Sequence, residues 1–282
     1  MSINFIKKIM LSGALVLGSM TMMAQAPFTG SKEFRKFSIG VNAGALRPSV
    51  VTGGGNDFTK PLYTLGYGGN LRYQFTHRFG IQADVLMGDL KGNNSKNYYN
   101  GLPATDRDNS SFKTKIGYAA SLSGALTFGS INWLNNNTRV VPYLNGGGGV
   151  ISYKPVTVAT GTTNEVAFDN GKAQTAFFVP VGVGLKFMLS DLVNLDLGYR
   201  ANFVDKDNLD GSEGVLGSNH KDKFSYGFLG LEFALGAKQK KQLLFDNPAA
   251  KLNQILQSQI TSIQTQVDTL KTATTDSDGD GV

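Results

Sequence analysis

The 282-residue chain has no cysteine, two histidines, eight prolines and, after residue 24, no long apolar run. The absence of cysteine excludes disulfide support, so an exported chain must be stabilised by a core or by a membrane. Two histidines, His77 and His220, exclude a histidine-rich metal site. The longest apolar runs fall short of the roughly 20 residues that a membrane-spanning helix needs. By contrast, the chain has 35 glycines and 10 % aromatics, which suits many twisted strands better than helices.

Residues 1–24 have the pattern of a secretory signal peptide. Two lysines precede a short apolar stretch, and the segment ends on the small residue Ala24. We expect cleavage after Ala24, with cleavage after Ala26 as the alternative. Without those two lysines the charge balance is 25 basic to 21 acidic residues. The excess is spread along the chain except for a cluster at 238–241, so nucleic acid is not indicated as a partner.

Eight segments between residues 37 and 236 alternate between apolar and polar residues. In the clearest one, 63–75, Tyr, Leu and Phe dominate the odd positions, while Thr, Gly, Asn, Arg and Gln fill the even ones. Because successive side chains of a strand point to opposite faces, each segment has one apolar and one polar face. The alternation slips near Gly230, which predicts a bulge or a bend there. The predicted strands are 37–46, 63–75, 79–90, 112–128, 140–153, 177–187, 194–203 and 224–236.

The two faces of these segments indicate which side meets lipid. The polar face mixes Gly, Ser and Asn with charges of both signs, and large aromatics stand near the ends of the apolar face. Aromatic rings at both ends of lipid-facing strands are typical of outer-membrane barrels. We therefore expect a transmembrane barrel with its polar face inside; a soluble β-domain with the apolar face inside is the alternative. In segment 112–128 this places Phe112, Ile116 and Tyr118 toward lipid and Lys115 toward the lumen.

Seven charged residues on the polar face predict a buried ion-pair network. An eight-stranded barrel is only wide enough for its own side chains to fill it. Opposite charges are therefore expected to pair with one another, and a narrow ion path is the alternative. The candidate lumen residues are Arg72, Asp84, Lys115, Lys186, Asp196, Arg200 and Glu232.

Long and short connections alternate between the segments, as they do in bacterial outer-membrane barrels with short periplasmic turns. With eight strands, both chain termini are expected at the short-turn, periplasmic end. After residue 236, Asn247 followed by Pro248 predicts the start of a helix. Apolar residues from Leu256 to Leu270 then recur at spacings of 4, 3, 4 and 3. We expect a helical spacer; the alternative is a small coiled coil with weak self-association through 248–272.

The last residues, "DSDGDGV", begin like a calcium loop. Asp276, Asp278 and Asp280 stand at positions 1, 3 and 5 of that pattern. Calcium takes six to eight oxygen ligands, and these three aspartates supply only the first few. A Ca²⁺ site and a disordered acidic tail are the two interpretations, and we expect no required cofactor.

A catalytic function is the competing class of hypothesis. Ser218, His220 and Glu213 form a Ser/His/acid set within eight residues of an outer loop. Such a set arises easily by chance, and the hydrogen-bonding geometry that activates a nucleophile is not encoded in spacing. His77 falls in a tight turn where we expect no chemical role. The sequence therefore predicts that the protein is not an enzyme.

The order of these parts resembles the OmpA family of Gram-negative outer-membrane proteins. The stretches that carry the resemblance are "VPYLNGGGGVISY", "FSYGFLGLEFALG" and "DSDGDGV". It implies an eight-stranded antiparallel transmembrane barrel with both termini periplasmic and, as partners, outer-membrane lipid and lipopolysaccharide. The family's Asp-rich linker usually precedes a peptidoglycan-binding domain, which does not occur in this sequence. We therefore expect a fragment, with a natural short form as the alternative.

The resemblance implies a structural anchor for a peptidoglycan-directed arm. The alternative function is a small channel or a surface adhesin that acts through its outer loops. The expected organisation is a signal peptide at 1–24, an N-terminal periplasmic segment at 25–36, the barrel at 37–236, a helical spacer at 237–275, and the start of an Asp-rich calcium-type repeat at 276–282.

Overall fold

The computed structural model describes most of the chain beyond its first 33 residues. Both the predicted signal peptide and the Asp-rich segment with Asp276, Asp278 and Asp280 lie outside the described residues, as do Ser218 and His220. The described ranges are 34–51, 58–97, 101–104, 107–129, 138–213, 221–237 and 239–275.

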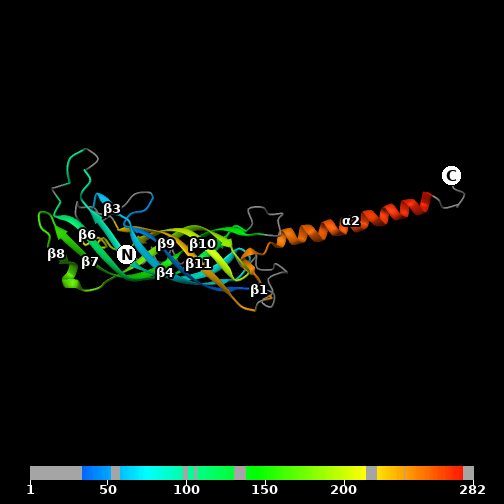
Figure 1. The fold of residues 1–282 in the computed structure, drawn as a ribbon, viewed down its shortest axis with the longest axis horizontal. Helices are drawn as coiled ribbons and strands as arrows, with labels where there is room; N and C mark the ends of the chain where they lie inside the picture. The colour runs from blue at the N-terminus through cyan, green and yellow to red at the C-terminus, as the bar shows by residue number, and fades with distance from the viewer. Residues whose placement is uncertain are drawn as a thin grey trace, which may run out of the picture.

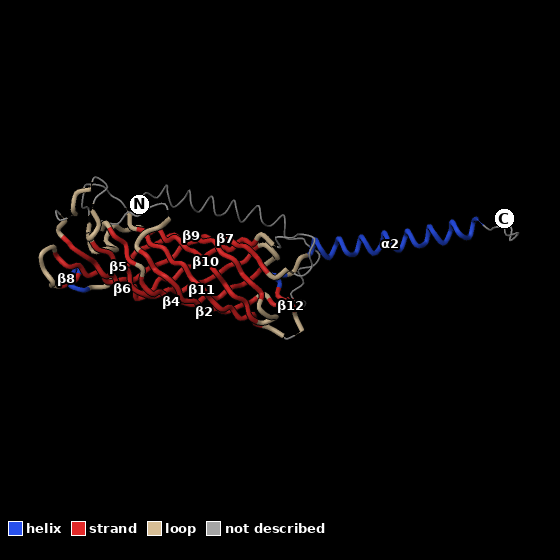
Figure 2. Tube along the Cα trace, turned by 45° about the horizontal axis from the view of Figure 1, so that its top comes forward, coloured by secondary structure: helices blue, strands red, loops and turns tan. Residues whose placement is uncertain are grey.

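Eight long antiparallel strands close into a barrel (Figures 1 and 2). Each strand pairs with the next in chain order, and the last pairs back to the first. Two short strands, β3 (Lys60–Leu62) and β8 (Glu165–Ala167), extend the sheet beside β5 and β7. The all-β class and the strand number predicted from the sequence are confirmed. The eight strands are β2 (Phe37–Arg47), β4 (Thr64–Gln74), β5 (Phe79–Asn93), β6 (Asn109–Thr127), β7 (Val140–Ala159), β9 (Gln174–Met188), β10 (Val193–Val204) and β11 (Lys223–Leu235).

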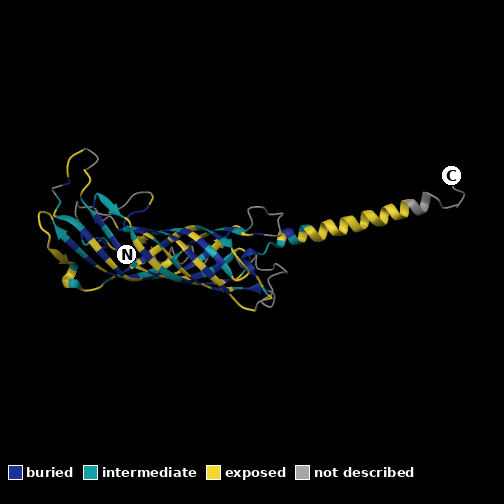
Figure 3. Cartoon of the chain, in the orientation of Figure 1, coloured by how far each residue is buried: buried dark blue, intermediate teal, exposed yellow. Residues whose placement is uncertain are grey.

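Side-chain burial follows the predicted alternation along most strands, as the chequered barrel wall of Figure 3 shows. On β4, Leu65, Tyr67 and Leu71 are exposed, whereas Asn70 and Arg72 are buried. The outer surface is therefore apolar and aromatic. The interior holds the polar residues that a water-soluble protein would expose.

The interior has two halves of different chemistry. Near the long-loop end it is filled by apolar and aromatic side chains, and Phe58 and Leu209 from the loops join them. Toward the short-turn end most buried side chains of the strands are charged or polar, and a small apolar cluster around Val141 lies at the base itself. The apolar half contains Leu46, Phe58, Leu86, Leu90, Phe112, Ile116, Ala119, Ile151, Tyr153, Ala176, Phe178, Val204, Leu209, Phe224, Tyr226 and Phe228.

The prediction for the first part of β6 is wrong. Phe112 and Ile116 are buried in the lumen, and Lys115 lies on the outer face. The register with β7 shifts between Ile116 and Tyr118, so Gly117 is an extra residue that reverses the alternation. Because everything before this bulge is displaced by one residue, each side chain there points to the face opposite to the predicted one.

The bulge predicted near Gly230 does not occur either. The register of β11 is continuous through Gly230 with both neighbouring strands. Tyr226 and Phe228 point inward and Leu229 and Leu231 point outward. The alternation is lost in the sequence because β11 passes through the apolar half of the lumen, where both of its faces are apolar.

The chain beyond β11 closes the short-turn end of the barrel. Strand β12 (Lys241–Gln242) pairs in parallel with β1 (Phe34–Arg35). The short 3₁₀-helix η2 (Leu243–Phe245) then buries its three side chains. A second 3₁₀ turn, η1 (Phe168–Gly171), lies at the opposite end of the barrel.

Helix α2 (Pro248–Thr275) projects away from this end of the barrel (Figure 1). It begins at Pro248 as predicted, and the Asn247 side-chain oxygen accepts a hydrogen bond from the backbone N–H of Ala250 at 3.3 Å. None of the described helices is apolar over a length sufficient to cross a membrane. The seam residues Leu256, Ile260, Ile263, Val267 and Leu270 are 42–64 % exposed.

Candidate functional site: the lumen and base of the barrel

Six of the seven predicted lumen charges are buried inside the barrel, and Lys115 is not. Each of the six is at most 5 % exposed. They come from five strands and gather in the half of the lumen nearer the short turns. The six are Arg72 on β4, Asp84 on β5, Lys186 on β9, Asp196 and Arg200 on β10, and Glu232 on β11.

Lys186 is the centre of one part of the network. Its ammonium group lies 2.7 Å from an Asp196 carboxylate oxygen and also binds Glu232. The other Asp196 oxygen accepts a hydrogen bond from the Tyr143 hydroxyl at 2.9 Å. The Lys186 ammonium also stands 5.3 Å from the centre of the Tyr143 ring. A Cβ on Gly184 would lie 2.5 Å from the Tyr143 hydroxyl oxygen, so only glycine leaves room for this ring.

Asp84 and Arg200 form the second part. The Arg200 guanidinium lies 2.9 Å from Asp84 Oδ1, and that oxygen also accepts a 2.9 Å hydrogen bond from the Gln82 side chain. Arg72 donates from Nε to Gln74 Oε1 at 3.2 Å, and its guanidinium stands 5.8 Å from the Tyr143 ring centre. The two parts therefore meet around Tyr143 from opposite walls.

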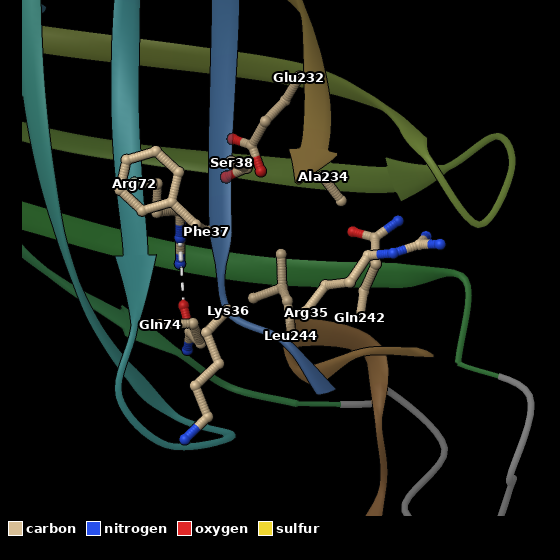
Figure 4. Close-up of a pocket in the computed structure, with 10 residues that line it drawn as sticks. All are labelled: Arg35, Lys36, Phe37, Ser38, Arg72, Gln74, Glu232, Ala234, Gln242 and Leu244. Carbon is tan, nitrogen blue, oxygen red and sulfur yellow. Dashed lines mark hydrogen bonds between the residues drawn. The ribbon is translucent and has the colours of Figure 1, made fainter. Parts of the chain in front are cut away.

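The network carries no net charge. Three cations, Arg72, Lys186 and Arg200, stand against three buried carboxylates. Buried charges persist when they are paired and hydrogen-bonded, because taking single ions out of water costs several kcal/mol each. Figure 4 shows Arg72 bonded to Gln74, with Glu232 on the far strand. The cavity beside them has a volume of about 20 Å³, enough for about one water molecule.

A second group of polar contacts closes the base. Gln242 donates to the Asn194 side chain at 3.0 Å and accepts from it at 2.7 Å. Arg35 donates to the carbonyl oxygen of Ala237 at 2.9 Å and also to that of Asp191 in the β9–β10 turn. The strand pair β1–β12 is thereby attached to the barrel wall.

The start of α2 is held by an ionic cluster. The side-chain oxygens of Asp246 lie 3.1 Å from His77 Nε2 and 2.6 Å from the Lys251 ammonium. Burial alone raises the pKa of Asp246, but hydrogen bonds from His77 and Lys251 outweigh it and hold that pKa below 3.8. The His77 ring also makes an edge contact with Phe34, at 5.8 Å between centroids. The Thr127 hydroxyl donates to the His77 carbonyl at 2.9 Å.

The sequence did not predict these contacts at the base of the barrel. The tight turn around His77 showed no reason for a chemical role, and its partner Asp246 is 169 residues away. One local signal existed: the apolar run Leu243 to Phe245 after the last strand. In the structure Leu244 and Phe245 pack on Val141 at the barrel base.

Among the described residues no group of three His, Cys, Asp or Glu side chains could hold a metal ion. Glu213 is described but both of its proposed catalytic partners lie outside the described residues. Its side chain instead accepts a 2.8 Å hydrogen bond from Asn208. The arrangement is one that stabilises and closes a barrel.

A closed eight-stranded antiparallel barrel with an apolar, aromatic outer surface and charged side chains inside is typical of outer-membrane β-barrel proteins. Comparison with protein families agrees. Residues 12–228 match the model for the outer membrane protein beta-barrel domain, and the chain belongs to that family. A search of curated protein sequences found no match.

Several solved outer-membrane proteins are similar to this chain at low sequence identity. Neisserial surface protein A is 16 % identical over 71 % of this chain and 97 % of its own, with a TM-score of 0.41. The attachment invasion locus protein Ail of Yersinia pestis is 15 % identical over 71 % and 98 %, with a TM-score of 0.39. The N-terminal barrel of Pseudomonas aeruginosa OprF is 11 % identical over 71 % and 98 %, with a TM-score of 0.36.

Proposed function

We propose that this protein is a structural outer-membrane barrel that holds a periplasmic, peptidoglycan-directed arm, in the manner of the OmpA family. The observation that carries the proposal is the buried attachment of α2 to the barrel base. Asp246, two residues before the helix, is bound by His77 from the β4–β5 turn and by Lys251 from the first turn of α2. These contacts fix the start of an otherwise exposed helix to the barrel, as an arm that carries a load would require.

The orientation follows from the connections. Outer-membrane barrels carry short turns on the periplasmic side and long loops on the outside. Residue 34 and the start of α2 both lie at the short-turn end. In this proposal both ends of the chain are periplasmic and α2 extends toward the cell wall.

The lumen argues for a structural role and against the channel. Two lumen sections lie in series: the neutral ion network, and the apolar half closed by residues such as Phe112, Phe178 and Phe224. An ion would have to cross both. We expect planar bilayers containing the purified protein to show no steady single-channel conductance; discrete, ion-selective openings would contradict the structural function.

A second candidate, a surface adhesin, has one specific observation in its favour. Strands β6 and β7 have 19 and 20 residues, and a barrel strand needs only about 9–11 residues to cross the membrane. These strands therefore continue well beyond the bilayer as a rigid outer extension. Adhesion of cells that display the protein, compared with cells that lack it, tests this candidate separately.

The tether is tested by co-sedimentation with purified peptidoglycan sacculi. Protein extracted from its native membrane in mild detergent is mixed with sacculi and centrifuged, beside a variant that ends at Gly236. We expect the protein with its arm in the pellet and the shortened barrel in the supernatant. Equal partition of the two proteins would refute the tether. Heat-modifiable migration of both proteins verifies that the barrel is folded.

A further inference from the structure

A cluster of lysines lies on the outer face of strands β5, β6 and β7, toward the long-loop end. The strand register sets Lys113 opposite Lys91 and Lys115 opposite Lys154. Residues directly opposite each other share a face, and like charges in such pairs destabilise a sheet. Three of the four are exposed and Lys91 is half-buried. We call these four residues the lysine patch.

The patch is largely uncompensated by the described part of the chain. Asp89 lies 3.6 Å from the Lys113 ammonium and stands opposite Lys115 in the strand register. Among the described residues no other ion pair within 4.0 Å involves the patch. Glu165 on β8 stands opposite Val158, four residues beyond Lys154 along β7. Four lysines and one aspartate leave a net charge of +3. An external anion is the natural partner of such a surface.

The lysine patch lies at the edge of the lipid-facing apolar band that is nearer the long loops. Tyr63 and Tyr73 are both exposed and stand ten residues apart around β4. Ten residues span about 33 Å along a strand and, at the usual tilt, about 25 Å along the barrel axis. This is the height of the lipid-facing band, whose edges carry the aromatic girdles. Lys91 pairs with Leu62, the neighbour of Tyr63, so the patch stands at the level of the lipid headgroups.

The surface below the patch is continuous and apolar. On the same strands Met87 and Tyr118 are 37 % and 45 % exposed, and Leu122 beyond them is 60 % exposed. The ligand that fits has acyl chains to lie along this surface and anionic groups at its head. The two lysine pairs are two residues apart along β6, about 7 Å, so each pair can face a separate phosphate.

We propose that the lysine patch binds the phosphate groups of a phosphorylated glycolipid of the outer leaflet, of the lipid A type. Lysine ammonium groups bind phosphate as compact point charges. The inference rests on the proposed orientation, with the long loops outside the cell. The continuous apolar surface favours a lipid over a free phosphate or a soluble anionic glycan, neither of which would use it.

The test is titration of the folded protein, in a zwitterionic detergent, with bisphosphorylated lipid A, followed by native mass spectrometry. The variant is Lys115→Gln/Lys154→Gln, which removes one of the two opposed lysine pairs and leaves the Lys113–Asp89 ion pair in place. The matched control, Lys206→Gln/Lys223→Gln, removes two lysines at the same end of the barrel but outside the patch. Each basic residue near an anionic lipid surface contributes about 1 kcal/mol, and about 1.4 kcal/mol is a factor of ten in affinity. We therefore expect the patch variant to bind about thirtyfold more weakly and the control to be unchanged.

Two further probes separate the sources of the anion. Lipid A from which both phosphates have been removed is expected to bind the wild type more weakly than intact lipid A binds the patch variant, because the variant keeps one lysine pair and its phosphate. Inorganic phosphate and a sulfated disaccharide are expected not to compete. Equal losses in patch variant and control, or full competition by either soluble anion, would overturn the inference. Heat-modifiable migration and outer-membrane fractionation of each variant report separately on the proposed function.

Discussion

Replacing Lys186 with methionine tests whether the lumen network stabilises the barrel. The side chain is fully buried and binds both Asp196 and Glu232. Methionine retains much of the volume but removes the charge, so two buried carboxylates lose their common partner. Breaking a buried ion pair by removing one member costs about 3–5 kcal/mol, because the remaining charge is left uncompensated.

The cost of protonating a carboxylate sets an independent upper bound on this loss of stability, and it is of similar size. A carboxylate left without its cation can be neutralised by a proton, which for an ordinary aspartate with a pKa of about 3.9 costs about 4 kcal/mol at pH 7. One such protonation limits the loss per carboxylate to about that value. Asp196 also keeps its hydrogen bond from Tyr143, which reduces the loss further. A loss of about 3–5 kcal/mol in the free energy of unfolding is therefore expected.

The assay is equilibrium unfolding in urea of the barrel reconstituted in lipid vesicles, with the folded fraction read from heat-modifiable migration. With a slope of about 3 kcal/mol per molar urea, the upper end for a folded domain, the midpoint should fall by about 1–2 M. Lys115→Met is the matched control, because Lys115 lies on the outer face of β6. Its expected change is within about 0.5 kcal/mol.

A rescue variant completes the test. The double variant Lys186→Met/Glu232→Leu removes one buried charge of each sign, so Arg72 and Arg200 still balance Asp84 and Asp196, and such paired replacements are often neutral or stabilising. We expect it to recover most of the lost midpoint. If Lys186→Met unfolds at the same urea concentration as Lys115→Met, the network contributes no stability and the reasoning is refuted.

Three further predictions concern the base and the arm. His77→Ala removes a buried partner of Asp246 at a cost of about 1–3 kcal/mol, so trypsin should cleave at Lys241 faster while the barrel remains intact; unchanged cleavage would mean that the clamp does not hold the base. The folded-state pKa of Asp246 is depressed, so its stabilisation is complete above about pH 4 and is lost as pH falls below that value. Pepsin, which is active in acid and cleaves at apolar residues, should therefore cut within Leu243–Phe245 faster as pH falls from about 4 to about 2, measured relative to a free peptide of the same sequence. A flat ratio would contradict the assignment. If α2 pairs with a second copy through its apolar seam, Val267→Cys should form disulfide-linked dimers in membranes. Adding Ile260→Lys to that variant should abolish the dimers. Equally abundant dimers with and without Ile260→Lys would contradict pairing through the seam.

The barrel could be predicted from the sequence because one face of its wall contacts lipid and the other faces the lumen. Wherever one face meets lipid and the other a polar lumen, the side-chain period of two is visible in the sequence, as on β4 from Leu65 to Gln74. Where the lumen itself is apolar, inward and outward residues are both apolar and the alternation is not visible in the sequence. For this reason the sequence of β11 predicts a bulge near Gly230, although the register of the strand is continuous there. Period alone cannot tell an apolar interior from lipid.

The error at Lys115 has a different cause. One extra residue, Gly117, reverses every side chain that precedes it on β6. An isolated glycine within a strand is a known signal for a bulge, but this chain has 35 glycines, so the signal did not single out one position. The registers of β5 and β7 were needed to locate the bulge.

Contacts between distant parts of the chain were not predictable at all. Residue type indicated that Lys186 would find a carboxylate, but not that it would take both Asp196 and Glu232. The pairing of His77 with Asp246 joins a hairpin turn to a segment that follows the whole barrel. No periodic pattern encodes such a contact, because neither residue repeats on any face.

The base contacts define how a pull on α2 would reach the barrel. Force on the helix passes through Asp246 to His77 in the β4–β5 turn, whose carbonyl is bound by Thr127 at the end of β6. A second route runs through Gln242 to the β9–β10 turn, where it donates to the carbonyl oxygen of Asp191 at 3.2 Å, and to Asn194 on β10. The load is therefore shared by strands on different sides of the barrel and does not peel β11 from its neighbours. A closed ring of strands has no free edge at which unzipping can begin, so an attachment spread over several turns suits a barrel that works as an anchor.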